Sequence, residues 1–115
     1  MVKVFYLLKR RADLTPEQFH RYWREQHAPL FCKMEIARRY VVRYEQNHAP
    51  PQDVELFGGH FDGASVMWLR SVEDLVAMRA DPEYGEIVRD GQNFLDPTAT
   101  KLLLTEAEEP FEILK

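Results

Sequence analysis

Four stretches of the chain are rich in apolar, β-branched and aromatic residues, and each is bounded by turn-forming or polar residues. This pattern predicts strands at residues 2–8, 38–48, 61–69 and 101–106. Between the second and third of these, residues 49–59 contain Pro50-Pro51 and Gly58-Gly59, which predict a loop.

Helices are predicted where capping residues precede an apolar stripe. Thr15 with Pro16 and Gln18 is typical of a helix start, and Phe19, Tyr22, Trp23 and then Gln26/His27 follow at helical spacing. Pro29 is expected to end or kink this helix near His27, with one short turn over residues 30–34. Ser71 to Asp74 predict a second helix, and residues 81–83 open a third that Gly91 closes.

The order strand, helix, strand occurs twice in the chain. We therefore expect an α+β fold of the ferredoxin-like βαββαβ type, a sandwich of one four-stranded antiparallel sheet with helices on one side. Residues on both faces of the predicted strands are apolar, whereas the helices suffice to cover only one face. The other face is predicted to pack against a second copy, which makes the protein a homodimer.

Length and composition restrict the class of protein. The 115 residues (13.6 kDa) are expected to form a single domain, 1–115, and 45% hydrophobic with 30% charged residues are ordinary globular values. The apolar runs are too short to span a membrane, and the first residues lack the features of a secretory signal. Cys32 is the only cysteine, so no internal disulfide forms and a cytoplasmic location is expected.

The charges are distributed unevenly. Residues 1–44 carry ten Lys/Arg and four Asp/Glu, and residues 45–115 carry five and fifteen. The basic residues are scattered rather than clustered, which argues against a nucleic-acid partner. Attraction between oppositely charged faces of two subunits accounts for the asymmetry better.

The four histidines, His20, His27, His48 and His60, do not have the spacing of a helical metal site, so no metal is expected. The sequence also has no glycine-rich phosphate-binding loop after a strand. We therefore expect no cofactor, and a small molecule as the substrate.

His27 and Tyr40 are the candidate catalytic residues. His27 lies on or beside the apolar stripe, where it is either a core histidine bonded to backbone or a general acid/base facing the gap between helix and sheet. Tyr40, placed early on the second strand, either packs in the sheet or donates to a developing oxyanion. Spacing alone leaves both alternatives open.

A second group consists of candidate substrate-binding residues. Most of its aromatic members are expected in the core, and any that face a cavity favour a flat or cyclic apolar ligand. The group comprises Phe19, Tyr22, Trp23, Tyr44, His48, Trp68 and Phe94.

The run from Leu14 to Leu30 contains the pattern F-x-x-Y-W-x-x-x-H-x-P-L and resembles the opening of EthD-domain proteins. Residues 61–68, the following segment 71–75, Asn93-Phe94-Leu95-Asp96 and Thr105-Glu106 are similar to later parts of that family. The resemblance extends over nearly the whole chain except residues 47–60.

The resemblance implies a dimeric α+β-barrel fold. EthD proteins are named for a gene cluster that degrades ethyl tert-butyl ether, and similar proteins include muconolactone-type isomerases, aromatic polyketide cyclases and decarboxylases that work without metal or cofactor. In methylmuconolactone methylisomerases, a histidine matching His27 and a tyrosine matching Tyr40 are tied to activity.

Three functions follow as hypotheses. The first is a cofactor-independent enzyme of small oxygenated cyclic or aromatic compounds, performing isomerisation, cyclisation, dehydration or decarboxylation. In it His27 moves a proton, Tyr40 and His48 hold an oxygen, and Phe19, Trp23 and Trp68 line the pocket. The second is a non-catalytic binding protein or an accessory protein of an oxygenase system. The third is a cofactor-free monooxygenase or haem-degrading relative, for which the sequence offers no specific residues.

Overall fold

The computed structural model describes residues 1–51 and 59–115; residues 52–58 of the predicted loop lie outside the described residues. The described elements are, in chain order, β1 (Val2–Leu8), α1 (Pro16–Tyr22), the π-helix η1 (Trp23–His27), α2 (Ala28–Lys33), α3 (Glu35–Tyr40), β2 (Val41–His48), β3 (Gly63–Leu69), α4 (Val72–Ala80), α5 (Tyr84–Gly91) and β4 (Lys101–Glu106).

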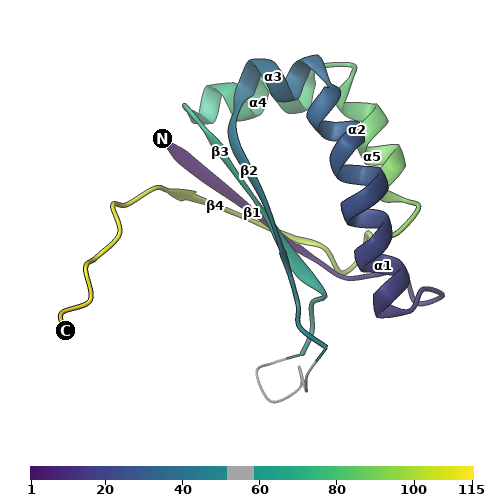
Figure 1. The fold of residues 1–115 in the computed structure, drawn as a ribbon. Helices are drawn as coiled ribbons and strands as arrows, with labels where there is room; N and C mark the ends of the chain where they lie inside the picture. The colour runs from purple at the N-terminus through teal and green to yellow at the C-terminus, as the bar shows by residue number, and fades with distance from the viewer. Residues whose placement is uncertain (52–58) are drawn as a thin grey trace.

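The strands of the described residues form one antiparallel sheet in the order β2-β3-β1-β4. This is the ferredoxin-like α+β arrangement, so the predicted fold class is confirmed. Val4 pairs with Met67 on one side and Leu104 on the other, and Met67 also pairs with Tyr44. These residues therefore share one face of the sheet. The helices lie against that face, as Figure 1 shows.

The core fills the space between the sheet and the helices in two adjoining clusters. The larger one joins Val4 and Met67 of the sheet to Phe31, Ile36 and Met78 of the helices. The smaller one comprises Leu8, Phe19, Trp23 and Phe94. Phe19 and Phe94 are completely buried, with their ring centroids 5.6 Å apart.

The first predicted helix starts where its capping residues indicated. The Gln18 N–H donates to the Thr15 hydroxyl, and the Thr15 N–H donates to the Gln18 side chain, which completes a capping box. The expected end near His27 is wrong, because helical backbone continues through η1 into α2 as far as Lys33. Proline interrupts an α-helix by removing one N–H and crowding the carbonyl four residues earlier, here that of Glu25. The wider π-turn over Trp23–His27 accommodates Pro29 without ending the helix.

The predicted strand 38–48 starts too early. Arg38, Arg39 and Tyr40 form the last part of α3, and β2 begins at Val41. The Glu83 carboxylate accepts the backbone N–H of Ile36 at 2.9 Å and that of Glu35 at 3.4 Å, which satisfies the free amides at the start of α3. This cap comes from a residue 47 positions later, so the local sequence contains no signal for it.

No helix of the described chain covers the sheet face opposite the helices (Figure 1), and its centre is apolar although charged residues such as Lys3, Arg43 and Glu45 surround it. Phe5 pairs with Val66 and Leu103 across three strands, and Trp68 lies on the same face. Lys3 and Arg43 lie over the Trp68 ring at 4.7 and 5.1 Å from its centroid. Leu103 is 55% exposed.

After Glu106 the chain extends away from the body of the subunit (Figure 1). Phe111, Ile113 and Leu114 of this segment are exposed. Across residues 1–51 and 59–115, none of the helices has both the length and the apolar character that crossing a membrane requires.

Candidate active site

A cavity of about 460 Å³ lies between the helix-covered face of the sheet and the helices. Aromatic and aliphatic side chains form most of its wall, among them Trp23, Phe31, Tyr44, Met67, Phe94 and Leu102. Its volume suits a compound of one or two rings. His27, Tyr6, Tyr84 and Arg79 add polar groups to this wall.

His27 is paired with a carboxylate. Its Nδ1 lies 2.7 Å from Oδ2 of Asp90, which belongs to α5, and its ring packs against Phe94 with centroids 4.8 Å apart. Asp90 Oδ1 accepts hydrogen bonds from the Tyr22 hydroxyl at 2.7 Å and from the Asn93 amide at 3.3 Å. Both side chains of the pair are mostly buried, with 15% and 14% exposed. The carboxylate is therefore held in place by three neighbouring groups.

The Asp90 carboxylate determines which nitrogen of His27 carries the proton. Burial would raise the pKa of Asp90, but the hydrogen bonds from Tyr22 and His27 outweigh it and lower that pKa. Asp90 is therefore ionised at neutral pH and only accepts, so His27 donates from Nδ1. Burial lowers the pKa of His27, against the opposing effect of Asp90. The neutral imidazole then has its lone pair on Nε2, which makes no hydrogen bond to the described residues.

The π-helix places His27 at the cavity. The Trp23 carbonyl accepts the Ala28 N–H, a bond that spans five residues rather than four. The same carbonyl also accepts the Gln46 amide at 3.0 Å, which ties the helix to β2. Trp23 and His27, four residues apart, both line the cavity, and the wider turn keeps the backbone helical between them and Pro29.

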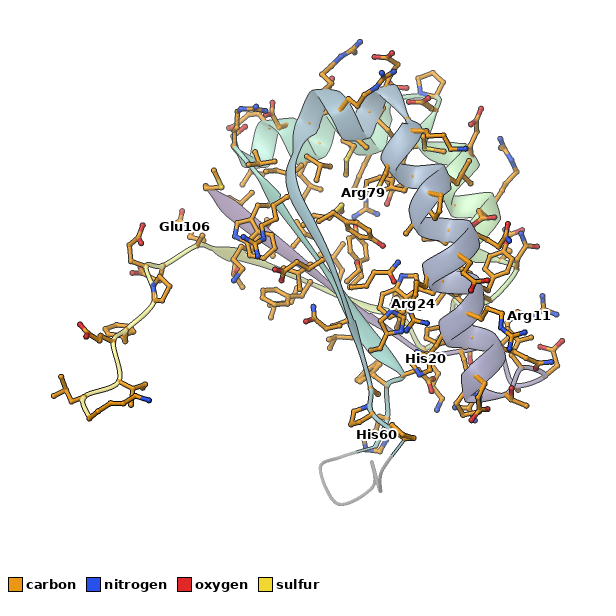
Figure 2. The ribbon with its side chains drawn as sticks, in the orientation of Figure 1. Arg11, His20, Arg24, His60, Arg79 and Glu106 are labelled. Atoms are coloured by element: carbon orange, nitrogen blue, oxygen red, sulfur yellow. The ribbon has the colours of Figure 1, made fainter. Side chains whose placement is uncertain are left out.

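A second polar network begins at Tyr44 on the cavity wall. Gln46 Nε2 donates to the Tyr44 hydroxyl at 2.9 Å, and Gln46 Oε1 lies 2.8 Å from His48 Nε2. His48 Nδ1 in turn lies 2.7 Å from His20 Nδ1. Figure 2 shows His20 on the helix beside the sheet. The chain of contacts runs from the cavity wall toward the end of the molecule that carries α1.

The directions of these hydrogen bonds follow from the Trp23 carbonyl. Because a carbonyl only accepts, the Gln46 nitrogen faces it and the Gln46 oxygen faces His48. His48 therefore donates from Nε2 and accepts at Nδ1. Burial, together with the charges of His20 and Arg24, lowers the pKa of His48 to about 4, so His48 is neutral at pH 7.

Tyr44 is left as a donor toward the cavity. Its hydroxyl oxygen already accepts the Gln46 amide, so its own hydrogen is available for a ligand. Burial raises the pKa of Tyr44 although the Gln46 hydrogen bond lowers it, and the hydroxyl remains protonated. The cavity thus has a lone pair on His27 and an O–H donor on Tyr44.

The structure brings some of the sequence-predicted site residues together and separates others. His27, Trp23, Tyr44 and Phe94 line the cavity. Tyr22 contacts Asp90 rather than the cavity. Phe19 is a completely buried core residue.

Three predicted residues lie away from the cavity wall. Tyr40 ends α3 and packs against the larger core cluster, so its expected position on a strand is wrong. His48 stacks on Trp23, with ring centroids 4.2 Å apart, behind Tyr44 and Gln46. Trp68 lies on the opposite face of the sheet and does not line the cavity.

Sequence reasoning missed Asp90, Gln46, Tyr6, Tyr84 and Arg79. Asp90 lies 63 residues after His27, and as a polar position on a helix it resembles any solvated carboxylate. The available signal lies in the residues around Asp90. Ile87, Gly91 and Phe94 place one face of this segment in the core, which indicates that the segment packs against the body of the protein. Within residues 1–51 and 59–115, no group of three or more His, Cys, Asp or Glu side chains has the arrangement of a metal site.

One four-stranded antiparallel sheet with helices against one face places the protein in the class of ferredoxin-like α+β proteins. Within this class, the chain belongs to the EthD domain family, whose model matches residues 11–98. The resemblance in the sequence is thereby confirmed.

Solved structures extend the likeness over nearly the whole chain. An ethyl tert-butyl ether D family protein of Bacillus halodurans is 19% identical, with a TM-score of 0.68, and the match covers 94% of this chain and 99% of that one. A dimeric ferredoxin-like protein of unknown function from Thermobifida fusca is 16% identical, with a TM-score of 0.66 and coverage of 92% and 90%.

SnoaB of Streptomyces nogalater, described as a cofactor-independent oxygenase, is 11% identical, with a TM-score of 0.64 and coverage of 95% and 94%. At these identities the structural likeness establishes the fold. A comparison with curated proteins found no match.

Proposed function

We propose that this protein is a cofactor-independent enzyme that moves a proton on a small oxygenated cyclic or aromatic compound. The observation that supports it most directly is the His27–Asp90 pair, with Nε2 of His27 unpartnered among the described residues on the wall of a mostly apolar cavity. The reactions within reach are isomerisation, cyclisation, dehydration and decarboxylation, because each can proceed through an enol or enolate when the substrate has a carbonyl next to the reacting carbon.

His27 acts in this proposal as the general base and then as the general acid. Nε2 removes a proton from a carbon or hydroxyl of the substrate, and Asp90 stabilises the imidazolium that forms. The Tyr44 hydroxyl donates to the substrate oxygen on which negative charge develops. The aromatic wall excludes water, which strengthens both interactions.

The bare sheet face supports a homodimer in which two sheets pack together. Phe5, Val66, Trp68 and Leu103 form an apolar surface, and Lys3 and Arg43 border it. The Thermobifida fusca neighbour is described as dimeric. The cavity lies on the other side of the sheet, so each subunit keeps its own site.

A variant at His27 tests the catalytic proposal. After a lactone, enol or polyketide substrate is found, His27→Ala and His27→Gln are expected to lower kcat/KM by about 100-fold or more, because positioned proton transfer contributes about 10²–10⁴-fold. His60→Ala is the matched control, since His60 is exposed and does not line the cavity. Activity of the His27 variants within about twofold of wild type would contradict the proposal. Ligand binding without turnover, unchanged in His27→Ala, would favour a carrier or accessory protein.

A cofactor-independent oxygenase is the second candidate, and the likeness to SnoaB favours it. The same deprotonation by His27 would produce a carbanion that reacts with O₂. A ring CH₂ would become C=O, with one oxygen atom in the product and the other leaving as water. In this reaction one mole of O₂ is consumed for each mole of product formed. The isomerase and lyase reactions consume no O₂, so a measurement of O₂ consumption distinguishes them.

A further inference from the structure

The cavity has a second polar region besides the His27–Asp90 pair. The hydroxyls of Tyr6 and Tyr84 lie 3.5 Å apart, and the Arg79 guanidinium is 5.8 Å from the centroid of the Tyr84 ring. All three side chains line the cavity, and Lys101 lines it from β4. Figure 2 shows Arg79 reaching from α4 into the space between the helices and the sheet.

Arg79 has no acidic partner among the described residues. The ion pairs of residues 1–51 and 59–115 engage Lys9, Arg10, Arg11, Arg38 and Arg43, together with His27, and Arg79 is in none of them. Lys101 is likewise in none of the pairs that the structure describes. Arg79 is exposed to solvent and also lines the cavity, so its guanidinium is free to pair with an anion that accepts from it in a bidentate arrangement.

The charge of Arg79 also affects the pKa of Tyr6, a residue of the cavity wall. Burial raises the pKa of the Tyr6 hydroxyl, and Tyr84 raises it further, whereas Arg79 lowers it. Tyr6 therefore keeps its proton and remains a hydrogen-bond donor or acceptor beside the cation. A ligand oxygen at this place would meet one cation and two phenol hydroxyls.

We propose that the natural substrate is a cyclic or aromatic carboxylate, whose acid group binds Arg79 and Tyr84 while its reacting atom lies against His27. This inference rests on the proposed function for the role of His27, but the binding of the acid group does not depend on catalysis.

Helix α5 carries one residue of each polar region, Tyr84 and Asp90. Tyr84 and Asp90 are six residues apart on it, and at 1.5 Å per residue this is about 9 Å along the helix axis. The two polar regions of the cavity therefore involve different turns of this helix. A compound of one or two rings fits the cavity of about 460 Å³.

Matched pairs of probes test this proposal without any turnover. Calorimetry compares benzoate with benzamide and 2-naphthoate with 2-naphthamide, since each pair has nearly the same shape and differs in charge. Wild-type protein is expected to bind a carboxylate at least 10-fold more tightly than its amide. Arg79→Met keeps the aliphatic stem but removes the charge, and it is expected to reduce this preference to about twofold or less, with amide binding unchanged.

Two further variants separate this proposal from the catalytic one. Arg21→Met removes an exposed arginine outside the cavity and is expected to leave the preference unchanged. His27→Ala is expected to abolish turnover and also leave the preference unchanged. Equal binding of carboxylate and amide by the wild type, undetectable carboxylate binding, or an unchanged preference in Arg79→Met would overturn the proposed substrate class. Activity retained in His27→Ala would overturn only the proposed function.

Discussion

At the scale of single residues, the account depends on how the surroundings of His27 control its proton. Two opposite effects act on its pKa: burial lowers it, and the hydrogen bond and charge of Asp90 raise it. Burial prevails, so the imidazole is neutral at pH 7 and its lone pair is on Nε2. A histidine of this kind is ready to accept a proton without first losing one.

Asp90→Asn tests the role of the carboxylate. In the wild type, kcat/KM is expected to rise with pH as His27 loses its proton, with an inflection at lower pH than for an ordinary histidine, because burial lowers the pKa of His27. The substitution removes the group that raises this pKa, so the inflection is expected to move to lower pH. The plateau is expected to fall about 10- to 1,000-fold, because the base becomes weaker and Nδ1–H loses its anionic acceptor.

The control for this experiment is Asp13→Asn, because Asp13 is exposed and pairs only locally with Arg11. Its pH profile is expected to match that of the wild type. A lower plateau in Asp90→Asn with an unmoved inflection would mean that Asp90 only supports the fold.

At the scale of secondary-structure elements, the contact between η1 and the sheet positions the cavity wall. Gly63 begins β3 directly beside the Trp23 ring. A Cβ at this position would lie 2.6 Å from the Asn47 carbonyl oxygen and 2.7 Å from the Trp23 ring. Both neighbours are constrained, one by the β2–β3 ladder and the other by complete burial in the core.

Gly63→Ala is therefore expected to destabilise the protein by about 1–3 kcal/mol, the usual cost of overpacking. Gly85→Ala, in the first turn of α5, is the matched control. Its Cβ would meet only the end of the Arg89 side chain at 3.4 Å, so it is expected to be neutral or to stabilise by up to about 1 kcal/mol. Denaturant unfolding measures both, and equal effects of the two substitutions would contradict the tight contact at Trp23.

The elements that the sequence predicted well have local signals. Thr15 and Ser71 accept from the backbone as caps, and strands 2–8 and 101–106 have the predicted bounds. The start of β2 was predicted wrongly because Glu83, distant in sequence, caps α3. The continuation past Pro29 was missed because the π-turn that permits it is tied to Gln46 of β2.

The residues of the candidate site, too, can be predicted from the sequence only where their signal is local. His27 was found because it lies on the apolar stripe of its own helix. Asp90 and Arg79 were missed because only the packing of α4 and α5 against the sheet brings them to the cavity. Tyr40 was preferred to Tyr44 as the hydroxyl donor on the assumption of a strand at residues 38–40, which are helical.

At the scale of the whole molecule, the helices shield one sheet face and leave the other uncovered, and we propose that a second copy packs against it. Leu103→Glu tests this arrangement. Leu103 is 55% exposed in the subunit, so the charge is tolerated there, but in a dimer it would be buried next to Phe5 and Val66. A penalty of about 2 kcal/mol or more would raise the dimer Kd by about 30-fold or more.

Sedimentation velocity at several concentrations measures this change. Val76→Glu is the control, since Val76 is 62% exposed on α4 and away from the bare sheet face. It is expected to leave the dimer intact. A wild-type protein that sediments as a monomer when dilute, or equal behaviour of the two variants, would contradict the paired sheets.

The central claim, that His27 is a neutral base with its lone pair toward the cavity, is tested most directly by ¹⁵N NMR of the histidine rings at pH 7. We predict a protonated Nδ1 and an unprotonated Nε2 for His27, and a shift of its Nε2 signal when 2-naphthoate is added. A proton on Nε2, or a His27 signal that 2-naphthoate and other cavity-sized ring compounds all leave unchanged, would contradict the account.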